Sequence, residues 1–100
     1  MHSSVRKYKT SDPSAVSKIS DEVEREFVDI VKQVDGFGGY YLIDGGGGIL
    51  ITITVAESED AVEASAAKAA EWVQGNETVS ALMEGAPDVT NGEVLISVSA

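Results

Sequence analysis

The chain has 100 residues, of which 43% are apolar, and a formal net charge of −10, which predicts one acidic globular domain over residues 1–100 with a single modest core. Few Lys and Arg, no Cys and one His, at position 2, argue against a nucleic acid partner, disulfides and most transition-metal sites. No apolar run approaches the roughly 20 residues that span a bilayer, and the first residues lack the apolar segment of a signal peptide, so we expect a cytoplasmic protein with no membrane partner.

The first predicted strand covers residues 3–10 and is strongly basic. It holds three of the seven cationic side chains, at Arg6, Lys7 and Lys9. Alternation along a strand puts Arg6 and Tyr8 on one face and the two lysines on the other. A buried cation on a central strand needs a partner. Arg6 is therefore either paired with an acidic residue or a functional cation that stabilises a developing phenolate.

The strand is followed by a predicted helix over residues 13–34. Asp12 has a side chain suited to cap this helix, and Pro13 suits its first position. Apolar residues recur along it at three- and four-residue steps, which is typical of a helix with one buried face. They are Val16, Ile19, Val23, Phe27, Ile30 and Val34. Gly36 is expected to end the helix in a left-handed conformation.

Two β-rich runs, residues 37–44 and 49–56, are joined by four consecutive glycines and predict a hairpin. The second run is largely apolar on both faces, so both faces require a covering layer. Helices can cover one face, and we expect a second copy of the chain to cover the other. Tyr40 and Tyr41 must point to opposite faces, one toward the helices and the other toward the barrel interior or partner.

A second long helix is predicted to begin after Ser58, a plausible N-cap. Its apolar face is built mainly from small residues, which allow close approach to the sheet: Val62, Ala66, Ala69 and Val73. Trp72, the only Trp, lies on or beside this face. Asn76 can cap a short third helix, and alternating residues predict a last strand over residues 93–99.

The predicted order is strand, helix, strand, strand, helix, strand, which is the ferredoxin-like βαββαβ plan of the α+β class. Right-handed crossovers then place both helices on one face of a four-stranded antiparallel sheet with strand order 4-1-3-2. The basic first strand becomes a central strand in this arrangement.

Three stretches carry a family resemblance that covers nearly the whole chain. They are RKYK at 6–9 followed by the Asp12-Pro13 pair, DGFxxYY at 35–41, and AEWV at 70–73 followed by PxVxxGEV at 87–94. In this order and spacing they resemble the antibiotic biosynthesis monooxygenase-like proteins. The resemblance implies a dimeric α+β barrel, in which two sheets pack face to face across a homodimer axis.

The resemblance also implies a set of functions. Some members are cofactor-free monooxygenases of polycyclic phenols and anthrones, and others degrade haem. Haem-degrading members pair a helical Trp with a downstream His and an Asn on the first strand. Here Trp72 matches, but Leu82 stands at the His position and the strand has no Asn, so we expect no cofactor. The alternatives are a non-enzymatic ligand-binding or stress-related dimer and a purely structural association domain.

We expect a small apolar pocket between the helices and the sheet, which would accept an apolar aromatic ligand. Arg6 and Tyr40 are the candidate catalytic residues, as a cation for a phenolate and as a hydrogen-bonding or proton-relaying phenol. Tyr8, Tyr41 and Trp72 are the candidate substrate-binding residues, with Trp72 stacking on a flat ligand. The competing interpretation for each aromatic residue is ordinary core packing.

Overall fold

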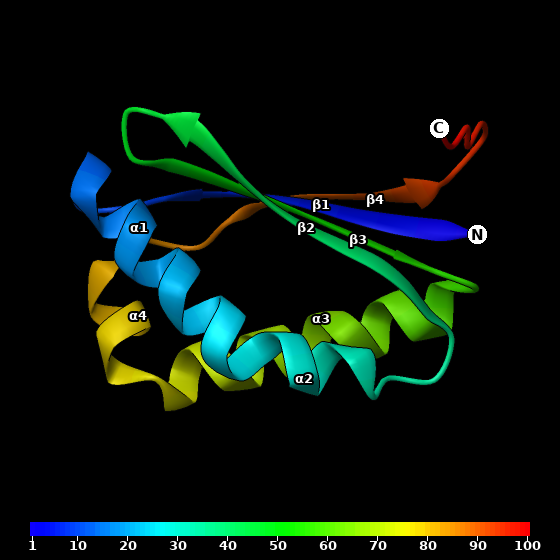
Figure 1. The fold of residues 1–100 in the computed structure, drawn as a ribbon, viewed down its shortest axis with the longest axis horizontal. Helices are drawn as coiled ribbons and strands as arrows, with labels where there is room; N and C mark the ends of the chain where they lie inside the picture. The colour runs from blue at the N-terminus through cyan, green and yellow to red at the C-terminus, as the bar shows by residue number, and fades with distance from the viewer.

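A computed structural model describes all 100 residues (Figure 1). The elements, in chain order, are β1 (His2–Lys9), α1 (Pro13–Glu22), the π-helical turn η1 (Val23–Phe27), α2 (Val28–Lys32), β2 (Phe37–Gly46), β3 (Ile49–Ala56), α3 (Glu59–Gly75), α4 (Glu77–Leu82) and β4 (Asp88–Glu93). No helix combines the length and the apolar character that crossing a membrane requires.

The strands form one antiparallel sheet in the order β2-β3-β1-β4, which confirms the predicted topology. All the helices lie on one side of this sheet, and the other side has no covering layer (Figure 1). The basic strand β1 is central, as predicted, between β3 and β4. On β1, Ser4, Arg6 and Tyr8 are more buried than Val5, Lys7 and Lys9, so the predicted division into two faces is also confirmed.

The predicted last strand, residues 93–99, is wrong in position, because β4 ends at Glu93. The partner of β4 is β1, and their pairing ends at His2 opposite Glu93. One more hydrogen bond runs from the Val94 amide to the Met1 carbonyl oxygen at 2.9 Å, and beyond it no strand of the same chain remains to pair with. The apolar side chains of Leu95, Ile96 and Val98 are therefore 86%, 83% and 89% exposed.

The predicted helix starts are confirmed by their caps. The Asp12 carboxylate accepts hydrogen bonds from the backbone amides of Ser14 and Ala15, Ser58 accepts from Ala61, and Asn76 accepts from Val79. Donation from the hydroxyl and amide of Ser14 holds the pKa of Asp12 below its ordinary value.

The elements α1, η1 and α2 follow one another directly where the sequence predicts one long helix. The helix widens at η1. There the backbone amide of Val28 donates to the Val23 carbonyl oxygen, five residues back. Such turns in α-helices are uncommon and are found frequently at functional sites.

The hairpin turn is fixed at its last glycine. Gly46, Gly47 and Gly48 all have positive φ, and Gly48 also lies against Thr10. The amide and the hydroxyl of Thr10 both donate to the Gly48 carbonyl oxygen, at 2.9 Å and 2.6 Å. A Cβ on Gly48 would lie 3.0 Å from the Thr10 hydroxyl, so only glycine fits here without a shift.

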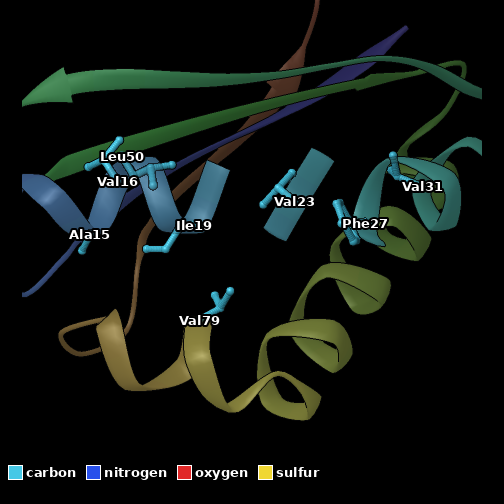
Figure 2. Packing of buried hydrophobic residues seen from close by; sticks show 8 residues of the cluster. All are labelled: Ala15, Val16, Ile19, Val23, Phe27, Val31, Leu50 and Val79. Atoms are coloured by element: carbon cyan, nitrogen blue, oxygen red, sulfur yellow. The ribbon is translucent and has the colours of Figure 1, made fainter. Parts of the chain in front are cut away.

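The main core lies between the first helix and the helix-facing side of the sheet (Figure 2). Its buried members come from α1, η1, α2, β3 and α4: Ala15, Val16, Ile19, Val23, Phe27, Val31, Leu50 and Val79. Figure 2 shows Ile19 and Val79 pointing toward each other from α1 and α4. Partly buried residues of α3 pack against this core, and the candidate site lies on that side: Ala69, Trp72 and Val73.

Candidate functional site

A small, narrow cavity of about 30 Å³ lies between the sheet and the helices. All but one of its lining side chains are hydrophobic, and the exception is Thr52 on β3. Tyr8 on β1, Tyr40 on β2, Phe27 on η1 and Trp72 on α3 supply the aromatic part of the wall. The strands and helices thus place aromatic rings on both sides of one space, as a site for a flat apolar ligand requires.

Phe27 lies at the centre of the aromatic group. Its ring centroid is 5.5 Å from that of Tyr40 in an edge-to-face arrangement with an interplanar angle of 64°. It is also 5.5 Å from Trp72, with an angle of 39°. Both distances are in the range in which aromatic pairs attract each other beyond simple burial. The η1 turn therefore positions Phe27 to support the two rings at once.

Tyr40 is the titratable group whose environment is most perturbed. Burial raises the pKa of its phenol well above the ordinary value, and Tyr8 nearby raises this pKa further. The positive charge of Arg6 acts on the pKa of Tyr40 in the opposite direction. Tyr40 is therefore a neutral phenol near pH 7, which can donate a hydrogen bond and is a poor general base.

Arg6 is half-buried on the helix-facing side of β1, close enough to act electrostatically on Tyr40. It makes no salt bridge, since the chain has one ion pair and that pair joins Arg25 to Glu22. The interpretation of Arg6 as a member of a structural ion pair is therefore wrong. Arg6 does not itself line the cavity.

The predicted substrate-binding residues are only partly brought together. Tyr8 and Trp72 line the cavity together with Tyr40, the candidate catalytic phenol. Tyr41 does not line it, because it points to the opposite face of β2 and is 59% exposed. The predicted opposition of Tyr40 and Tyr41 is confirmed, and it separates Tyr41 from this cavity.

A second, larger hollow lies on the outside of the helical layer. This outer groove has a volume of about 900 Å³ and is lined by residues of η1, α2 and α3 and of the segments next to them. Ile30, Val34 and Ala61 contribute apolar surface, and Glu26 and Lys68 are among the charged residues that line it. Trp72 lines both the outer groove and the inner cavity. It therefore lies between them.

The Glu26 carboxylate holds the outer edge of Trp72 and also binds the side chain of Asn76. The indole Nε1 donates a hydrogen bond to Glu26 Oε1 at 3.0 Å, and Asn76 Nδ2 donates to the same oxygen at 3.1 Å. Sequence reasoning missed Glu26 and Asn76 as site residues, together with Phe27 and Thr52. Glu26 and Trp72 are 46 residues apart, and no local pattern connects them.

No group of three His, Cys, Asp or Glu side chains is placed to hold a metal ion. Apart from the indole N–H of Trp72, which is bonded to Glu26, the hydrogen-bonding groups of the cavity wall are hydroxyls, which suits a small organic ligand with one or more hydroxyl or carbonyl groups.

Comparison with known proteins gives structural relatives only. No family model matches the sequence, and no curated protein matches it. Among solved structures, a monooxygenase of Streptomyces coelicolor in complex with nanaomycin D has 16% identity and a TM-score of 0.77, with 99% of this chain and 91% of that one covered. The cofactor-independent oxygenase SnoaB of Streptomyces nogalater has 12% identity and a TM-score of 0.68, over 99% and 97% of the two chains.

A third structure with this fold is a single-substitution mutant of MhuD with two manganese protoporphyrin IX molecules bound per active site. It is 18% identical and covers 100% of both chains with a TM-score of 0.72. The chain thus has the ferredoxin-like α+β fold of the antibiotic biosynthesis monooxygenase-like proteins, which confirms the fold that the sequence motifs implied. At these identities the likeness establishes the fold alone, because one fold serves many reactions.

Proposed function

We propose that the chain is a cofactor-independent monooxygenase that oxidises a hydroxyaromatic molecule of the anthrone or naphthol type. The observation that carries the proposal is the aromatic cavity between helices and sheet, with the neutral phenol of Tyr40 in its wall and the unpaired Arg6 nearby. Support also comes from the two structural relatives described as a monooxygenase and as a cofactor-independent oxygenase.

The proposed reaction balances without a cofactor. In the keto form of the substrate, a ring carbon that carries two hydrogens becomes a carbonyl carbon. One atom of O2 enters the product, and the other leaves as water with the two hydrogens. The substrate thus supplies all the electrons that reduce O2. The protein then has to stabilise the anion that the substrate forms when it loses a proton.

The chain's own residues have separate roles in this proposal. Tyr40 donates a hydrogen bond to the oxygen on which negative charge develops, and Arg6 stabilises that charge electrostatically. Phe27 and Trp72, in contact with each other, form one aromatic wall against which the flat ring system packs. No carboxylate or imidazole lines the cavity. The proposal therefore assigns no general base to the chain, and the proton passes to solvent.

The same lack of a general base favours a second candidate function, a ligand-binding module without turnover. Such a module would bind hydroxyaromatic molecules in the same cavity and leave them unchanged. Saturable binding without oxygen consumption would identify it.

We also propose that the chain acts as a homodimer, joined through the uncovered face of the sheet. This face carries the half-exposed side chains Ile49, Ile51, Ile53 and Val55 of β3, together with Tyr41 and Ile43 of β2, which are 59% and 40% exposed. A continuous apolar surface of this kind marks an interaction site. A second copy offers the same surface to it, as two-fold symmetry requires.

The monooxygenase proposal is tested by oxygen uptake with 1,8-dihydroxyanthrone, corrected for its spontaneous oxidation. We expect Arg6→Ala to lower kcat/KM by about 100-fold, the usual loss for one electrostatic contact to a developing anion. Tyr40→Phe, which removes one hydrogen bond, should cost about tenfold. The matched control is Lys7→Ala, which removes a neighbouring cation from the opposite face of β1. Equal rates for the Arg6 and Lys7 variants, or no uptake above the spontaneous rate, would contradict the proposal.

A further inference from the structure

The inner cavity is too small for the ligand proposed for it. Its volume of about 30 Å³ holds no more than about two water molecules, whereas small-molecule sites usually measure about 300–1,000 Å³. The outer groove, at about 900 Å³, is in that range. A flat aromatic ligand therefore reaches the phenols of the cavity only if a side chain of the intervening wall moves.

Trp72 is the side chain placed to make that movement. It lines both hollows, and its displacement would join them. It is only partly buried, so its indole borders solvent on the groove side. Phe27 supports it from η1, with 5.5 Å between the ring centroids.

The polar hold on Trp72 comes from one carboxylate oxygen, Glu26 Oε1. It accepts the indole N–H and the side-chain amide of Asn76, at 3.0 Å and 3.1 Å. We call this pair of hydrogen bonds the Glu26 latch. It lies at an exposed position, so water competes with it and its net strength is limited. A contact of this kind can break and re-form without unfolding its surroundings.

The same π turn carries both supports of the indole, since Glu26 and Phe27 are consecutive residues of η1 (Val23–Phe27). The Glu26 latch holds the edge of the indole, and Phe27 packs against the ring. A change in this one turn therefore alters both contacts together.

We propose that Trp72 gates ligand access from the outer groove to the inner cavity, and that Glu26 is the positioning residue that holds the gate closed. The inference rests on the proposed function, because it assumes that the cavity receives a flat aromatic ligand. It adds to that function the route of access, between η1–α2 and α3, and a residue that sets the rate of access.

The test is stopped-flow binding of 1,8-dihydroxyanthraquinone, which is coloured and is already at the oxidation level of the product. Glu26→Ala should raise the association rate constant by about tenfold, because loss of the latch raises the population of the open conformer that admits the ligand. The affinity should rise by a similar factor, because the closed cavity is too small to hold the ligand. Trp72→Phe, which keeps a ring but lacks the N–H donor, should show the same acceleration. The double variant should be no faster than either single variant, because both remove one contact.

The matched control is Glu24→Ala, an exposed carboxylate on the same turn that makes no side-chain hydrogen bond. It should leave both rate constants at the wild-type values. Thermal unfolding of every variant shows whether the fold is retained. Unchanged rates in Glu26→Ala, or equal acceleration in Glu24→Ala, would overturn the gate and leave the proposed function standing.

A ligand-free measurement keeps the two proposals distinguishable. If the dye binds to no variant, the proposed function fails at this cavity, and the gate is decided by ¹⁹F NMR of 5-fluorotryptophan at position 72. A second conformer that gains population in Glu26→Ala would support a movable Trp72. One sharp resonance, unchanged by the substitution, would overturn the gate.

Discussion

The surroundings of Tyr40 change the pKa of its phenol. Burial between β2 and the helices raises the pKa of the phenol, because the phenolate would lose its hydration. Tyr8 adds to this effect, and Arg6 opposes it. The outcome is a neutral hydrogen-bond donor close to a cation, which is a suitable pair for stabilising an anion formed on a bound ligand.

This raised pKa predicts how stability depends on pH. In the unfolded chain Tyr40 ionises near pH 10, its ordinary value, whereas in the folded chain it ionises only at higher pH. Its contribution to stability is therefore fully present below pH 10 and is lost as the pH rises from there toward the folded pKa. The free energy of unfolding should fall by up to about 1.4 kcal/mol per pH unit above pH 10 because of this residue.

Urea unfolding of the wild type and of Tyr40→Phe between about pH 9 and pH 11 measures this contribution. The wild type should lose stability more steeply than the variant, since Phe cannot ionise. Parallel curves for the wild type and Tyr40→Phe would show that Tyr40 is not buried as described.

At the scale of elements, the sheet has two apolar faces and one layer of helices. Ile53 lies near the centre of the uncovered face, opposite Val5 on β1 and Tyr41 on β2. Lys7 lies on the same face, so the surface that we assign to the dimer is apolar with a basic residue within it.

Ile53→Lys should separate the dimer and leave the chain folded, because an unpaired ammonium group at the centre of an apolar interface costs far more than one at a free surface. We expect the wild type at micromolar concentration to show twice the chain mass of 10.5 kDa by light scattering. The variant should bind its own copy at least about 100-fold more weakly. Ser17→Lys, on the exposed side of α1, should remain dimeric. A well-folded wild-type monomer would contradict the dimer.

Local rules explain why much of the fold could be predicted from sequence. Asp12, Ser58 and Asn76 cap helices because their side chains satisfy free backbone amides, whatever the rest of the chain does. The boundary of β4 could not be predicted in this way. Residues 93–99 alternate like a strand, but a strand needs a partner, and the register of β1 with β4 ends at His2.

In the candidate site, too, local sequence rules predicted some residues and could not predict others. Tyr8, Tyr40 and Trp72 could be predicted because alternation and helical spacing place them toward the space between helices and sheet. The π turn could not, because apolar spacing does not distinguish it from ordinary helix. Glu26 and Asn76 therefore became recognisable only from the hydrogen bonds that Glu26 accepts from Trp72 and from Asn76.

At the scale of the whole molecule, the two faces of the sheet have different roles in our account. The helix-facing side holds the aromatic cavity with Tyr8 and Tyr40, and the other side presents the apolar surface assigned to a second copy. Tyr41 belongs to the second side. A ligand site and an oligomer interface can therefore change independently, which suits a fold found in proteins with different ligands.

The central claim is that the cavity beside Trp72 binds a hydroxyaromatic ligand, and an anaerobic fluorescence titration tests it most directly. Trp72 is the only indole of the chain, and 1,8-dihydroxyanthrone without O2 binds without turnover. We expect saturable quenching with one site per chain, weakened in Ala69→Leu, which fills the cavity, and unchanged in Lys7→Ala. Emission that neither the anthrone nor acrylamide alters would mean that Trp72 is closed core, and would contradict the claim.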